Sequence, residues 1–181
     1  MLTKIRISTT AALTLFLLFS FPSLSFAWHD ETHLAIAKAA GYQKWYNAAG
    51  ADIAKVKAGD KEGHNHYSNN PPDVVVTPKM ILDQVAKYND PIDEKGHLYG
   101  AIIASFRDYR SAKATGKYGE YHLAYCAHYV GDLSMPLHNT LFNAFNRQHH
   151  AAMDGIVNDV VLDHPERIKI YPIAIKSEDD L

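Results

Sequence analysis

The 181-residue sequence contains a single cysteine, Cys126, which excludes an intramolecular disulfide framework and a cysteine-rich zinc finger. It also has no marked excess of charge, because 18 Lys and Arg face 20 Asp and Glu, for a formal net charge of −2. A strongly basic nucleic-acid-binding surface and an acidic solvating tail are therefore excluded as main features. Internal repeats and low-complexity linkers are absent from the sequence, and its length suits one domain.

One long uncharged apolar run is present, and it lies near the N-terminus. Residues 11–21 follow two basic residues and precede Pro22 and the small-x-small sequence Ser25-Phe26-Ala27. This order is typical of a secretory signal peptide, and the run is too short to cross a membrane comfortably, which disfavours a transmembrane anchor. We therefore expect residues 1–27 to be cleaved, which leaves an exported domain, periplasmic or secreted, that begins at Trp28.

The remaining sequence has helical periodicity, since its apolar residues recur three and four positions apart. Helices are expected over residues 30–46, 77–88, 96–114, 120–132 and 141–162. Asp30 or Thr32 would cap the first helix, and Thr77 followed by Pro78 would begin the second. The segments 59–63 and 69–72 read as loops because they are rich in Gly, polar residues and Pro. We expect a single all-α domain over residues 28–164, and the tail 165–181 receives no structural assignment.

Histidine is unusually frequent, with 11 residues, none of them in the expected signal peptide. His128 and Asp132 are four residues apart, so on a helix both side chains lie on one face and can reach one ion. His150 and Asp154 repeat this spacing, and His138 lies between the two pairs. A single pair of this kind is more often an exposed ion pair, but two pairs joined by a His-bearing turn favour a metal site. His138, His150 and Asp154 would form an open three-ligand zinc site, and iron or manganese could use the same donors.

A family resemblance appears at these residues. The sequence His128-Tyr-Val-Gly-Asp132, followed by Pro136-Leu-His138, resembles the zinc-dependent phospholipase C and S1/P1 nuclease superfamily. The resemblance extends to the start of the mature domain, where Trp28 follows the expected cleavage site and His33 stands five residues later. It covers residues 28–154 and implies a compact all-α fold of the phospholipase C/P1 nuclease type with three zinc ions.

The resemblance also implies a ligand for each zinc ion, with Asp52 and the pair His66-Tyr67 matching the rest of the pattern. The first zinc would be held by Asp52, His66, His128 and Asp132. The second would be held by the α-amine and carbonyl of Trp28 and by His33, with Asp132 as a bridge, and the third by His138, His150 and Asp154. His64 is an alternative to His66. Because only cleavage before Trp28 frees that amine, export and metal loading would be coupled.

The implied activity is hydrolysis of a phosphodiester by a zinc-activated water, with Asp52 orienting that water or taking its proton. The compact length and the N-terminal pattern favour a phospholipase C-like enzyme acting on phospholipid or another phosphodiester. Glu31 matches an acidic position that binds the lipid head group in that branch, but the aromatic positions expected with it are Ile53 and Gly63 here. The alternatives are a single-strand nuclease that stacks a base on Tyr67, a non-catalytic zinc-binding relative, and a multi-histidine haem or copper carrier. No stable protein partner is implied.

Overall fold

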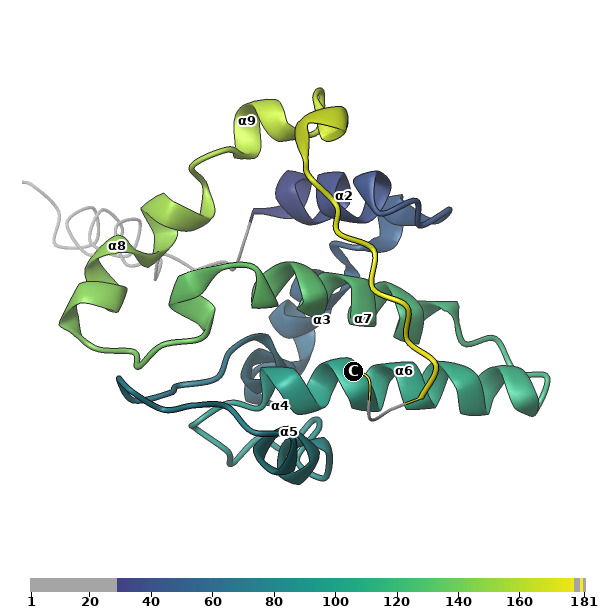
Figure 1. Ribbon diagram of the computed structural model, residues 1–181, viewed down its shortest axis with the longest axis horizontal. Coiled ribbons are helices and arrows are strands. Elements are labelled where there is room, and N and C mark those ends of the chain that lie inside the picture. The colour runs from purple at the N-terminus through teal and green to yellow at the C-terminus, as the bar shows by residue number, and fades with distance from the viewer. Residues whose placement is uncertain (1–28, 178–179, 181) are drawn as a thin grey trace, which may run out of the picture.

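The computed structural model describes residues 29–177 and residue 180, and helices are the only regular secondary structure in this part of the chain (Figure 1). The α-helices are α2 (Asp30–Ala39), α3 (Gly50–Ala58), α4 (Asp60–Gly63), α5 (Pro78–Val85), α6 (Leu98–Ala114), α7 (Glu120–Leu133), α8 (Ala144–Asp154) and α9 (Asn158–Val161). Three short 3-10 helices lie between them, η1 (Trp45–Asn47), η2 (His64–His66) and η3 (Pro136–His138), and a fourth, η4 (Pro165–Arg167), follows α9. The predicted all-α, single compact domain is confirmed for these residues. The expected signal peptide, residues 1–27, and Trp28 lie outside them.

The two longest helices, α6 and α7, form an antiparallel pair through the middle of the molecule (Figure 1). Helix α5 packs against α6, while α2 and α3 pack against α7. The core between them consists of Ala51, Leu98, Ala101, Ile102 and Tyr129. Cys126 also packs against this core, and burial raises the pKa of its thiol to about 11, which disfavours the reactive thiolate.

Helix α5 begins as the sequence predicts. The Thr77 hydroxyl oxygen accepts a hydrogen bond of 3.3 Å from the amide of Met80, and Pro78 occupies the first helical turn. Helix α6 begins at Leu98 rather than at residue 96 because Gly96 has a φ of 70°, which an α-helix does not allow. Both helices therefore match their predicted positions to within a few residues.

The first predicted helix is shorter than expected and is capped differently. Asp30 and Thr32 lie inside α2 rather than at its cap, and no side chain caps the helix. Instead, Asp30 and Glu31 lie in the first turn, where their negative charge faces the positive end of the helix dipole. The helix ends at Ala39, and Gly41, with a φ of 79°, prevents its continuation toward residue 46.

Three other helical assignments were wrong. Helix α3 was not predicted, and the segment 59–63, expected to be a loop, contains the short helix α4. The single helix expected over 141–162 is instead two helices, α8 and α9, separated by a turn that begins at Gly155. The buried face of α3 carries Ala51 and Asp52 rather than large apolar residues, so its sequence lacks the pattern of a packed helix.

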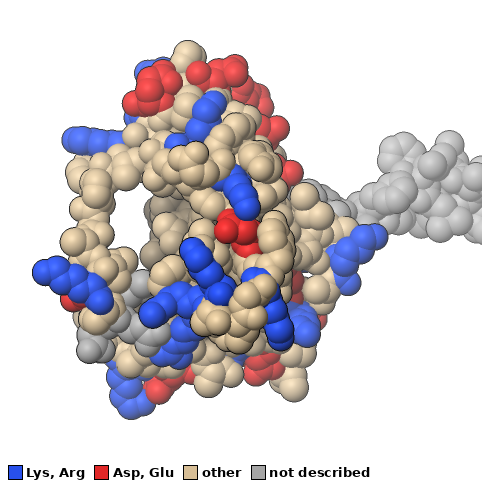
Figure 2. Space-filling view, turned by 90° about the vertical axis from the view of Figure 1, so that its right-hand side faces the viewer, with Lys and Arg blue, Asp and Glu red and all other residues tan. Residues whose placement is uncertain are grey.

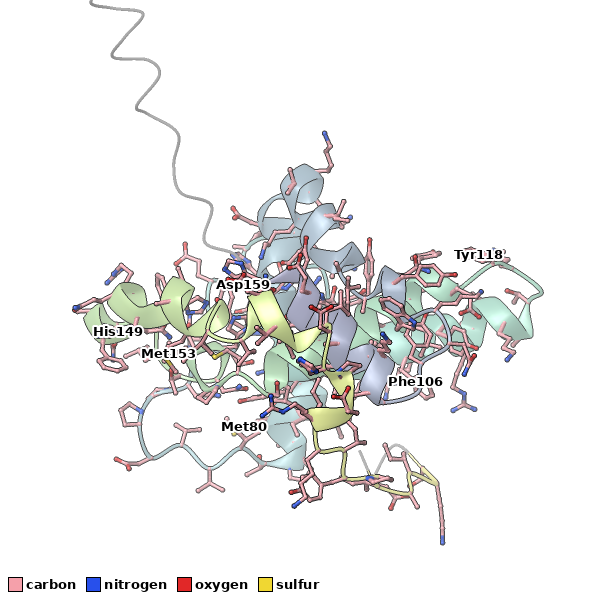
Figure 3. The ribbon with its side chains drawn as sticks, turned by 90° about the horizontal axis from the view of Figure 1, so that it is seen from above. Met80, Phe106, Tyr118, His149, Met153 and Asp159 are labelled. Atoms are coloured by element: carbon pink, nitrogen blue, oxygen red, sulfur yellow. The ribbon has the colours of Figure 1, made fainter. Side chains whose placement is uncertain are left out.

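The tail after η4 is extended and passes in front of α7 and α6 in the view of Figure 1, and no strand in the described residues pairs with it. Ile170, Ile173 and Ile175 in this tail are exposed. Tyr118, in the turn between α6 and α7, lies at the opposite end of the molecule from α8 (Figure 3). The face at the α6–α7 end carries both basic and acidic side chains (Figure 2). No helix among the described residues has the length and apolar character that crossing a membrane requires.

Candidate metal centre

Asp132 lies at the centre of the candidate site. It stands one turn after His128 on the buried face of α7, and neither residue is exposed to solvent. Asp132 Oδ2 lies 2.9 Å from His66 Nδ1 and 3.4 Å from His128 Nε2. Asp132 Oδ1 lies 3.4 Å from His33 Nε2 and 3.3 Å from His138 Nδ1. One carboxylate thus meets imidazoles from α2, η2, α7 and η3.

The first possible metal triad consists of Asp52, His66 and His128, contributed by α3, η2 and α7. His128 Nε2 lies 3.6 Å from Asp52 Oδ2 and 3.2 Å from His66 Nδ1. All three side chains are buried. These residues, together with Asp132, are the set that the resemblance implies for the first zinc.

The second triad is His33, His128 and Asp132, so it shares His128 with the first. The rings of His33 and His128 are stacked with their centroids 3.6 Å apart. This contact requires glycine at position 131, since a Cβ there would lie 2.6 Å from His33 Nδ1. Trp28, the other ligand that the resemblance implies for this ion, lies outside the described residues.

The third triad is His138, His150 and Asp154, contributed by η3 and α8. His150 Nε2 lies 3.1 Å from Asp154 Oδ2, and His138 Nε2 lies 3.8 Å from Asp154 Oδ1. The His150 side chain is 13% exposed, which makes this triad the most open of the three. His149, by contrast, lies with Met153 on the outer side of α8 (Figure 3) and does not join the triad.

Several of these imidazoles are oriented by a second hydrogen bond. His128 Nδ1 lies 2.6 Å from the carbonyl of Ala48, and His138 Nδ1 lies 2.8 Å from that of His66. His150 Nδ1 lies 2.7 Å from Asn146 Oδ1. Because these oxygens are acceptors, the Nδ1 atoms donate, and in the neutral imidazole each Nε2 is the nitrogen that could bind a metal in its triad. Metal-binding histidines commonly have such a partner on the opposite ring nitrogen.

The triads also contain most of the buried polar atoms that make no hydrogen bond in the described part of the chain. They include Asp52 Oδ2, Asp132 Oδ1, both carboxylate oxygens of Asp154, both ring nitrogens of His33, and Nε2 of His66 and His138. Leaving such atoms buried without a partner costs about 1–3 kcal/mol each. A bound cation would satisfy those of them that face into a triad, and the donor set of imidazole nitrogen and carboxylate oxygen without thiolate fits zinc. The three triads are therefore possible metal sites.

Electrostatics at the centre favour positive charge beside Asp132. Burial alone would raise the pKa of Asp132, but the surrounding imidazoles, His128 first, hold it well below its usual range. Burial and the neighbouring His33 lower the pKa of His128 to about 3. Burial opposes the charging of His138, but the adjacent Asp132 raises the pKa of its imidazole to about 10. A divalent metal would supply the positive charge that this buried carboxylate attracts.

A cleft of about 370 Å³ opens beside the triads, and His66, His138 and His150 line part of its wall. Lys55 also lines it, and its Nζ lies 2.8 Å from Asp52 Oδ1. Burial alone would raise the pKa of Asp52, whereas His128, His66 and Lys55 lower it, with a net decrease. Asp52 is therefore held as a carboxylate in the first triad, with Lys55 of the cleft wall as its partner.

Of the two predicted substrate-binding residues, Tyr67 and Glu31, only one lies in the cleft wall. Tyr67 lines the cleft, and its hydroxyl donates to the carbonyl of Glu94 at 3.4 Å. Glu31 is exposed on α2 and is not part of the cleft wall. His64, the alternative to His66, lines the cleft with its Nδ1 at 3.2 Å from the carbonyl of Asp90, and only His66 belongs to a triad.

Two residues near the triads were missed from the sequence, Lys55 and Glu62. Glu62 is four residues before His66, which is the same spacing that identified the two His-Asp pairs, so that signal was available. Lys55 follows Asp52 by three residues on α3, a helix that was not predicted.

Comparison with known proteins found no match to this chain among family models, curated proteins or solved structures.

Proposed function

We propose that this chain is an exported, zinc-dependent phosphodiesterase similar to phospholipase C, with three zinc ions per chain. The observation that carries the proposal is the convergence of His and Asp side chains from α2, α3, η2, α7, η3 and α8 into three adjoining buried triads beside one cleft. Every metal ligand expected from the sequence that lies in the described residues belongs to one of these triads. Closely spaced divalent ions suit hydrolysis of a phosphodiester.

Zinc ions in these triads would lower the pKa of a water molecule and neutralise charge on the phosphate and on the leaving oxygen. The side chains have separate tasks. Asp52 would orient the attacking water or accept its proton, since its carboxylate belongs to the first triad and is paired with Lys55 of the cleft wall. Lys55 holds Asp52 Oδ1 and so fixes the direction of the carboxylate. His150, at the open triad, would face the substrate.

The proposal includes cleavage before Trp28, which would free an amine as a ligand. Support comes from the first described residue of the chain. A Cβ at Gly155 would lie 3.1 Å from His29 Nε2, so the start of the described chain is next to the residue that follows Asp154.

The substrate we favour is a phospholipid or another phosphodiester, and single-stranded nucleic acid is the second candidate. The observation that favours the second is the half-buried ring of Tyr67 in the cleft wall, on which a base could stack. The exposed position of Glu31 gives no support to its assignment as a head-group ligand.

The test is elemental analysis of the exported protein after its N-terminal residue has been identified, followed by hydrolysis of bis-p-nitrophenyl phosphate. We expect Trp28 at the N-terminus, about three zinc ions per chain, and hydrolysis that stops when a chelator removes the metal. Comparison of phosphatidylcholine vesicles with single-stranded DNA then separates the two substrates. Full zinc content without hydrolysis would indicate a non-catalytic zinc-binding relative, and a chain without zinc would refute the proposal.

A further inference from the structure

A buried carboxylate next to the candidate metal centre is not explained by the metal triads. Glu62, on α4, is 5% exposed. The Tyr129 hydroxyl donates to Glu62 Oε1 at 2.5 Å, and Asn65 Nδ2 donates to Oε2 at 3.2 Å. Burying a carboxylate is costly unless it is hydrogen-bonded, so both oxygens have been given partners that also fix their direction.

This fixed carboxylate is directed at His66. Glu62 Oε1 lies 3.6 Å from His66 Nε2, and that nitrogen is buried and makes no hydrogen bond. The opposite nitrogen, His66 Nδ1, lies 2.9 Å from Asp132 Oδ2 and faces the first triad. The imidazole is therefore held between two carboxylates, one inside the metal centre and one behind it.

Asn65, one of the two residues that hold Glu62, is itself fixed by hydrogen bonds. Asn65 Oδ1 lies 2.8 Å from His97 Nε2 and accepts a hydrogen bond of 3.1 Å from the amide of Asn89. Asn65, His97 and Tyr129 are all fully buried. The orientation of Glu62 is thus set by the core of the domain and not by solvent.

We propose that Glu62 is a positioning residue for His66. The Glu62 carboxylate accepts a hydrogen bond from a proton on His66 Nε2 and thereby directs the lone pair of His66 Nδ1 to the metal. Tyr129 and Asn65 hold Glu62 in place for this task. The inference rests on the proposed metal centre, because positioning matters only if His66 is a ligand. A hydrogen-bonding partner of this type commonly changes metal affinity by about 10–100-fold.

The experiment is a zinc titration of the metal-stripped protein by competition with a chromogenic chelator. We compare the wild type with Glu62→Gln, and with Glu120→Gln as a control, since Glu120 forms its ion pair with Lys44 at the start of α7. We expect Glu62→Gln to weaken one of the three zinc ions by about 10–100-fold, and Glu120→Gln to leave all three unchanged. Tyr129→Phe, which keeps the ring and removes the donor to Glu62, should weaken the same ion to a smaller extent, and it serves if Glu62→Gln does not fold.

A second readout separates positioning from general stability. In a long-range proton–nitrogen NMR spectrum of the zinc-loaded wild type, we expect His66 to carry its proton on Nε2. Unchanged affinity in both variants, equal weakening of all three ions, or a proton on Nδ1 would each overturn the role of Glu62. If the wild type binds no zinc, the proposed function itself is refuted.

Discussion

The replacement Gly131→Ala tests whether the close contact between α2 and α7 builds a metal site. A Cβ at this position would lie 2.6 Å from His33 Nδ1 and 3.1 Å from His33 Cε1. His33 would have to retreat by about 0.8 Å to reach ordinary van der Waals contact. Metal-ligand distances tolerate deviations of only about 0.2 Å, so His33 should no longer be able to bind together with His128 and Asp132.

The expected magnitude has two parts with different signs. In a helix interior, alanine is favoured over glycine by about 1 kcal/mol, whereas the clash in the packed site costs about 1–3 kcal/mol. The metal-stripped variant should therefore be less stable than the wild type by about 0–2 kcal/mol. At zinc concentrations of about 100 times Kd, loss of one ion removes about 2.7 kcal/mol of stabilisation. At about 2–4 °C per kcal/mol, the zinc-induced increase in Tm should be smaller than that of the wild type by roughly 5–11 °C.

The assay is thermal unfolding with and without zinc, together with zinc content by elemental analysis. Gly63→Ala is the matched control, because Gly63 is also helical and a Cβ there would meet only Lys55 side-chain carbons at 3.9 Å. We expect one zinc ion fewer in Gly131→Ala and a normal content in Gly63→Ala. A Gly131→Ala protein with the wild-type zinc content and the wild-type increase in Tm would refute the role assigned to this contact.

Three further predictions follow from other parts of the structure. Asp132→Asn should abolish phosphodiester hydrolysis and lower zinc content, since it removes the negative charge between four imidazoles. The control Asp159→Asn, on exposed α9 (Figure 3), should change neither activity nor zinc content. An Asp132→Asn protein with full activity and full zinc content would contradict the assignment. Thr77→Ala should reduce the free energy of unfolding by about 1 kcal/mol in urea without changing zinc content, because only the cap of α5 is lost. Burial lowers the pKa of His97 despite Asp93, so the unfolded chain takes up its proton first as pH falls below about 6.5, and stability drops until the lower pKa of the folded state is reached. The stability difference between wild type and His97→Gln should therefore be smaller at pH 5.5 than at pH 7.5, and a constant difference would exclude this contribution.

The sequence predicted the centre better than it predicted the helices that surround it. Residues four apart on α7 and α8 must share a face, so the pairs His128–Asp132 and His150–Asp154 could be placed without knowledge of the fold. Helix α3 could not be predicted in this way, because its large apolar side chains lie on the exposed face and not on the buried one. Ile53 and Val56 are 64% and 60% exposed, while Ala51 and Asp52 form the buried side, so periodicity gives no signal for the face that packs.

The break at Gly155 and the role of Glu62 depend on tertiary contacts. The apolar pattern continues past Gly155 into Ile156, Val157 and Val160, which are exposed in the folded chain, so local sequence favours one long helix. Glu62 is four residues before His66, but its function as a hydrogen-bond acceptor becomes visible only when Tyr129, distant in sequence, is placed against it.

The second triad joins parts of the chain that are far apart in sequence, since His33 is on the first described helix and His128 and Asp132 are on α7. An ion bound there would close a loop of nearly one hundred residues. In the chain-entropy description, a cross-link over about 100 residues lowers the entropy of the unfolded chain by an equivalent of about 4.7 kcal/mol. For a sequence whose single cysteine forms no internal disulfide, metal coordination at the second triad would thus provide a reversible cross-link. It would form when metal is bound and be lost when a chelator removes the metal.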